Sequence, residues 1–153
     1  MERAINIILI IVCLLYTMSA VNYCIYLFRQ KDKAWRVAFR SFCAGTLIHV
    51  VAVVMQTIHY GNIPVHNMQQ TLSTATLAIA VAFIYVTRTF NLKILGVFAS
   101  VLAAAIMTAV LLIPEAPAQK HDILNRFWLW FHIVLVFLGE AALALACGTG
   151  ILY

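Results

Sequence analysis

The sequence predicts an all-α, polytopic transmembrane helix bundle of about five spans, with its N-terminus on the outer side of the membrane. Of the 153 residues, 65% are hydrophobic and only 10% are charged, whereas an average soluble domain carries about 25% charged residues. The apolar residues form runs of about 20 or more, long enough for a helix to cross a bilayer core of about 30 Å. These runs lack the alternation of transmembrane barrel strands. Each run is therefore expected to be a helix, which satisfies its own backbone in lipid.

The expected helices cover residues 4–28, 37–60, 68–87, 94–113 and 127–153 of a single membrane domain. The first apolar run is longer than the core of a signal peptide, and its stronger positive flank follows the run. We therefore expect a retained anchor. The second helix follows the basic segment that gives this flank.

The third helix has a recognisable start. Asn67 is a good N-cap residue, and Gln70 three positions later can return a hydrogen bond to the cap, as in a capping box. Gly61 and Pro64 belong to the connection before it, where the proline shapes the approach of the chain. A structural role in capping is our preferred interpretation of Asn67 and Gln70.

The fourth and fifth helices carry small residues at four-residue spacing, which is typical of close helix packing in membranes. The fourth has Gly96, Ser100 and Ala104, and the fifth has Ala142, Ala146 and Gly150. A polar, proline-rich connection over residues 114–122 separates the two helices. The fifth helix reaches the last residue without a charged flank, so we expect a chain that is truncated at its C-terminus.

Loop charge predicts the orientation. With the N-terminus outside, the inner side carries seven basic residues and the outer side three, in agreement with the positive-inside rule. The inner residues are Arg29, Lys31, Lys33, Arg36, Arg40, Arg88 and Lys93, and the outer ones are Arg3, Lys120 and Arg126. The net charge of +5 is thus explained by loops near anionic lipid. The sequence has no stripe of basic and aromatic residues that would indicate a nucleic acid as a partner.

The four cysteines lie within the apolar runs and form no C-x-x-C motif, which argues against a thiol redox centre or a zinc site. Histidines are more informative. His59, His66, His121 and His132 fall at or near the outer surface, and His49 lies deep in the bilayer. Glu140 lies at a similar depth to His49, so these two are candidates for a polar intramembrane pair.

His132 is the candidate ligand for haem iron, with Trp128 one turn earlier on the same helical face. An aromatic belt at the membrane interface is the structural alternative for Trp128. Two outer segments favour haem. Residues 61–72 (GNIPVHNMQQTL) resemble the G-x-x-P-x-x-N-x-Y-E-S-L segment of the CcsA/ResC branch of the cytochrome c assembly proteins, which include CcmC-type members. Residues 124–133 (LNRFWLWFHI) resemble the family's L-Q-S-Y-W-L-x-I-H-V segment, and residues 139–146 resemble its G-Y-A-A-F-A-L-A segment.

The resemblance covers residues 45–153 and implies the N-terminal half of such a protein, because the family's tryptophan-rich motif and second outer histidine do not occur here. It implies a multi-pass protein of the inner (plasma) membrane that presents haem b at the outer face to apocytochrome c. A CcsB/ResB-type membrane protein is the implied partner, and His132 is the implied axial ligand. Trp128 is expected to pack on the porphyrin. The chain alone is not expected to be an enzyme.

Two other functions remain open. A small transporter or channel subunit would use His49 and Glu140 in a polar path. A HemX-like accessory protein would belong to a sister group of the same family. A dihaem cytochrome ranks last, because only one histidine lies deep in the bilayer.

Overall fold

The computed structural model describes residues 2–61, 64–65, 67–114 and 127–152. In this part of the chain all regular structure is helical, and all five helices are long and apolar enough to cross a membrane. They are α1 (Glu2–Arg29), α2 (Asp32–Tyr60), α3 (Met68–Phe90), α4 (Leu95–Leu112) and α5 (Phe127–Leu152). The predicted all-α bundle of five spans is confirmed.

Two helix ends differ from the prediction by three residues or more. Helix α2 begins at Asp32, earlier than residue 37, and α3 continues to Phe90, beyond residue 87. Hydropathy marks only the part of a helix that fits the hydrocarbon core, whereas backbone hydrogen bonding continues through polar turns at the surface. Helix α3 ends where Asn91 adopts a left-handed conformation, with φ of 54° and its N–H bonded to the Thr87 carbonyl at 3.0 Å.

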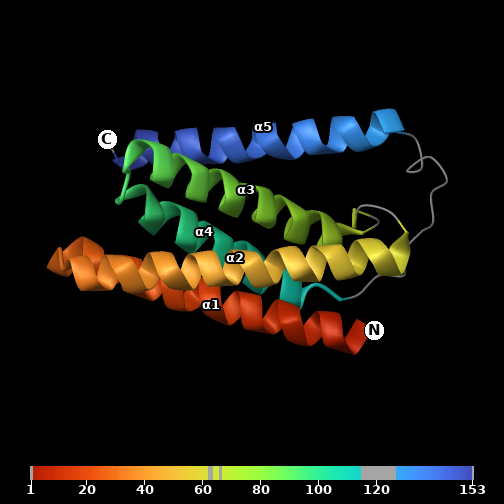
Figure 1. The fold of residues 1–153 in the computed structure, drawn as a ribbon, viewed down its shortest axis with the longest axis horizontal. Coiled ribbons are helices and arrows are strands. Elements are labelled where there is room, and N and C mark those ends of the chain that lie inside the picture. Colours follow the sequence, from red (N-terminus) through yellow and green to blue (C-terminus); the bar gives the residue numbers. More distant parts are fainter. Residues whose placement is uncertain (1, 62–63, 66, 115–126, 153) are drawn as a thin grey trace.

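The helices pack side by side as an up-and-down bundle (Figure 1). Helix α1 lies against α2 and α4, and α3 lies against α2, α4 and α5. Helix α5 sits at the edge of the bundle, against α3 and, over a smaller contact, α4. The N-terminus lies at the same end as the end of α2 and the start of α3, whereas the turns from α1 to α2 and from α3 to α4 lie at the other end.

An aromatic chain forms the centre of the bundle. Tyr16 on α1 packs against Phe42 on α2 with ring centroids 5.0 Å apart, and Phe42 contacts Phe83 on α3 at the same distance. Tyr23 on α1 meets the other side of Phe83 edge-on. Tyr23 also lies directly against α4, which is close enough only because position 96 is glycine. The four rings are fully buried and join three helices into one core.

The described residues just before α3 are held by hydrogen bonds. Asn67 is the N-cap of α3, and its side chain accepts a bond from the Gln70 N–H at 2.8 Å, which confirms the predicted cap. Pro64 is buried, and its carbonyl accepts from the Thr74 hydroxyl at 3.0 Å. Gly61 ends α2 with φ of 76°, a conformation that favours glycine. These contacts fix Pro64 and Asn67 onto the first turns of α3.

Candidate functional site

The predicted haem-binding residues lie in the first turns of α5, with their side chains exposed on the surface of the bundle. The Trp128 side chain is 76% exposed and packs loosely on Phe131, with ring centroids 6.3 Å apart. His132 is also exposed, one turn further along the helix. The structure thus leaves an imidazole and an indole accessible near each other on the outside of the bundle. Neither side chain is covered by another described helix.

Among the described residues, His59 is the other histidine at this end of the bundle, and it adds no ligand set. His59 lies in the last turn of α2, where its ring contacts Tyr60 edge-on at 4.8 Å. His66 and His121 lie outside the described residues. Within the described ranges, no three side chains of His, Cys, Asp or Glu come close enough to hold a metal ion. A haem iron needs no such group, because it takes only one or two axial ligands from protein.

His49 occupies a different site, fully buried in the middle of the bundle. Its Nε2 lies 2.9 Å from the Ser73 hydroxyl on α3, and its Nδ1 lies 3.3 Å from the Tyr16 hydroxyl on α1. Tyr16 donates to the Thr46 hydroxyl at 3.4 Å, and Thr46 donates to the Phe42 carbonyl at 2.9 Å. The consistent proton assignment has Nδ1–H donating to Tyr16 and Nε2 accepting from Ser73. Three helices are joined by this network.

This network corrects the expected pairing of His49 with Glu140. Both imidazole nitrogens are occupied by Tyr16 and Ser73, and Glu140 is exposed on α5 at the edge of the bundle. The expectation rested on a similar depth along the helices, but depth does not determine which way a side chain points around the helix axis. Tyr16 and Ser73 were missed by the sequence reasoning. Their polarity inside membrane helices was the signal that could have identified them.

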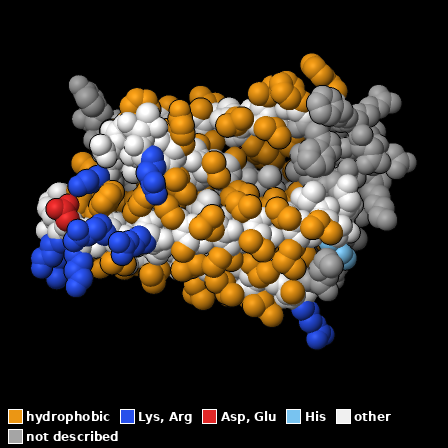
Figure 2. Space-filling view, in the orientation of Figure 1, with side chains coloured by type: hydrophobic (Ala, Val, Ile, Leu, Met, Phe, Trp, Pro, Cys, Tyr) orange, Lys and Arg blue, Asp and Glu red, His pale blue; other side chains and the backbone are white. Residues whose placement is uncertain are grey.

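Basic side chains gather at the end of the bundle opposite the N-terminus (Figure 2). Lys93, in the turn between α3 and α4, pairs with Asp32 at 3.3 Å and lies 4.8 Å from the centroid of the Trp35 ring. Arg88 lies over the Phe39 ring at 5.3 Å. The predicted inner loops therefore meet at one end. Cation–π contacts hold two of their charges against aromatic rings of α2.

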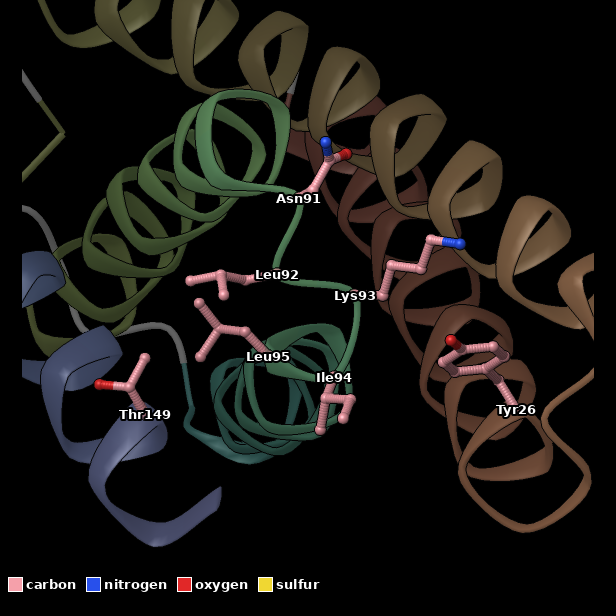
Figure 3. A pocket seen from close by; sticks show the side chains of 7 residues that line it. All are labelled: Tyr26, Asn91, Leu92, Lys93, Ile94, Leu95 and Thr149. Atoms are coloured by element: carbon pink, nitrogen blue, oxygen red, sulfur yellow. The ribbon is translucent and has the colours of Figure 1, made fainter. Parts of the chain in front are cut away.

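Two hollows lie away from His132. A cavity of 410 Å³ at the basic end is lined by the turn that contains Asn91 and Lys93, by Tyr26 of α1 and by Thr149 of α5 (Figure 3). A larger groove of 650 Å³ runs between α3 and α5, and its walls are almost entirely apolar, with Phe137 and Leu138 among them. The groove shows that α5 is packed incompletely on its neighbour.

Comparison with protein families, with curated proteins and with solved structures finds no match to this chain.

Proposed function

We propose that this chain is a haem-handling membrane component of cytochrome c maturation, which presents haem b at the outer face of the inner (plasma) membrane to apocytochrome c. The observation that carries the proposal is the exposed pair of Trp128 and His132 on one side of α5. We assign this pair to haem because the segments at residues 61–72 and 124–133 resemble those of the CcsA/ResC branch.

In this proposal His132 offers a neutral imidazole nitrogen to the iron, and Trp128 packs against one face of the porphyrin. Haem supplies the vinyl groups to which the cysteines of apocytochrome c add. The chain contributes binding and orientation at an apolar, partly water-excluded surface and catalyses nothing by itself. Because one histidine is a single axial ligand, a CcsB/ResB-type partner or further polypeptide would complete the coordination.

The orientation is part of the proposal. Lys31 lies in the turn between α1 and α2 and Lys93 in the turn between α3 and α4, and both turns are at the basic end of the bundle. We place this end on the cytoplasmic side according to the positive-inside rule. Trp128 and His132 lie in the first turns of α5, at the other end (Figure 1). This orientation puts His132 on the side where cytochrome c is matured.

The test is haem binding by the purified protein in detergent, followed by the Soret band on haem titration. His132→Ala should lose most of the binding, and added imidazole should restore the spectrum because it replaces the missing ligand. His59→Ala is the matched control, since His59 is the other described histidine of the outer end. Equal spectra for the parent and both variants would refute the assignment. Trp128→Leu should weaken binding without changing the ligation spectrum.

A small transporter or channel subunit is the second candidate function. The observation in its favour is the polar network of His49, Tyr16 and Ser73 at mid-depth, because ionisable groups inside a bilayer often line transport paths. The described cavities do not reach His49, which is fully buried. Solute or proton flux in vesicles that is abolished by His49→Phe, in a protein that stays colourless with haem, would favour this candidate.

A further inference from the structure

One line of residues on α5 points away from the rest of the bundle. Starting from Val136, it continues at alternating steps of four and three residues through Glu140, Leu143, Cys147 and Gly150. All five positions are exposed. We call this line the outward seam. Its spacing keeps the residues on one side of a helix and is the spacing found where two helices pack along each other.

The outward seam differs from a lipid-facing surface of the same chain. Helix α1 exposes a line with the same spacing, and each of its members is bulky and aliphatic: Ile7, Ile11, Leu14, Met18 and Val21. The outward seam instead has a carboxyl group at its centre and small residues at its C-terminal end. A Cβ atom added at Gly150 would meet no other atom within 4 Å. The backbone is therefore open to close approach.

Glu140 makes lipid an unsuitable neighbour for the outward seam. It lies in the middle of α5, about 20 Å along the axis from Phe127 at roughly 1.5 Å per residue. A carboxyl group at that depth needs a hydrogen-bond partner, because hydrocarbon offers none. Helix α5 contacts its neighbours through another side, on which Ala141, Leu145 and Gly148 are buried. None of the described helices therefore covers Glu140.

We propose that the outward seam of α5 is the interface of a symmetric dimer of this chain. All copies insert with the same orientation, so a two-fold axis along the membrane normal brings the two Glu140 side chains together at equal depth. Two carboxyl groups that share a proton both donate and accept, so Glu140 complements itself. The outward seam carries no lysine or arginine that would call for an acidic partner. Cys147 and Gly150 let the two backbones approach, as in other membrane helix pairs.

The native cysteine on the outward seam provides a direct test. With Cys13, Cys24 and Cys43 replaced by alanine, mild oxidation of the protein in vesicles should convert most of it to a Cys147–Cys147 disulfide dimer. The matched control has Leu47→Cys as its single cysteine, with Cys147 also replaced, because Leu47 is 69% exposed on α2, which is remote from the seam. The control should give only the background of random collisions. Equal cross-linking at both positions would overturn the proposal.

Energy transfer between labelled copies in vesicles separates the roles of the side chains. Glu140→Gln should keep the association because an amide also donates and accepts, whereas Glu140→Leu should weaken it about tenfold. Gly150→Leu should weaken it similarly by separating the backbones, and Ala44→Leu on the exposed side of α2 should change nothing. The chain could instead stay monomeric by itself and associate only with a helix of another membrane protein that carries a lysine at the depth of Glu140. That result would overturn the dimer in favour of a different partner. The outcome does not depend on haem, so it stands apart from the His132 experiment.

Discussion

Substituting Gly96 by alanine should disrupt the contact between α1 and α4 more than its single added methyl group would suggest. The new Cβ would fall on the edge of the Tyr23 ring, closer than the 3.0 Å that real Cβ atoms keep, and 2.7 Å from the Tyr23 hydroxyl oxygen. Tyr23 cannot move aside easily, because it is fully buried and packs edge-on with Phe83, with ring centroids 6.2 Å apart. The clash has to separate the two helices.

Overpacking of this kind costs typically about 1–3 kcal/mol, and alanine returns up to about 1 kcal/mol through its higher helix propensity. We expect Gly96→Ala to lower the free energy of unfolding by about 1–2 kcal/mol, measured by titration with SDS in mixed micelles. The control is Gly139→Ala, where the added Cβ meets nothing within 4 Å, so stability should stay the same or rise. Tyr23→Leu should relieve the defect when combined with Gly96→Ala. A Gly96→Ala protein as stable as the Gly139→Ala protein would refute the packing at this contact.

Three further outcomes follow from the contacts of single residues. Ser73→Ala should lower the free energy of unfolding by about 0.5–1 kcal/mol, the worth of one hydrogen bond between membrane helices. His49→Phe should lower it more, because it removes two hydrogen bonds. Equal stability of both variants and the parent in SDS titrations would argue against the network of His49, Tyr16 and Ser73. Asp32→Asn should change stability by less than about 0.5 kcal/mol, since the pair with Lys93 is exposed; a loss above 1 kcal/mol would contradict this. Cysteines introduced at Lys31 and Lys93 should react with an impermeant maleimide from the same side of sealed vesicles, and reaction from opposite sides would refute the up-and-down topology.

The number and extent of the helices could be predicted because a bilayer imposes a length on every span. A run of apolar residues such as that of α4, bounded by Pro114 and by the polar turn before residue 94, leaves little choice of boundaries. The ends that were missed, at Asp32 and Phe90, lie in polar turns that the length argument does not reach. Capping chemistry at Asn67 is local, and it was therefore also predictable.

The partners of His49 could not be predicted in the same way. Its depth follows from counting residues, but its neighbours depend on how α1, α2 and α3 are rotated about their axes. In water the hydrophobic face of a helix fixes that rotation, whereas in lipid most faces of a span are apolar. The rotation here is set by packing details such as Gly96 against Tyr23 and by the hydroxyl groups of Tyr16 and Ser73.

The small-residue stripes show what does distinguish the faces of membrane helices. On α4, Gly96 and Ser100 are buried in the bundle, as close packing predicts. On α5 the residue that sits against a neighbour is Gly148, next to Phe98, whereas Ala146 and Gly150 are exposed.

The stripe of small residues on α4 thus packs against other helices of the bundle, whereas residues of the stripe on α5 are exposed. Small and polar residues in a membrane span mark contact with protein, so their outward position on α5 indicates a contact that the five described helices do not supply. His132 lies on this side too, roughly 12 Å along the axis from Glu140 at 1.5 Å per residue. Association through the outward seam would therefore bring a second copy next to the imidazole that we assign to haem. A haem-binding defect in Glu140→Leu that imidazole does not restore would separate this effect from loss of the iron ligand in His132→Ala.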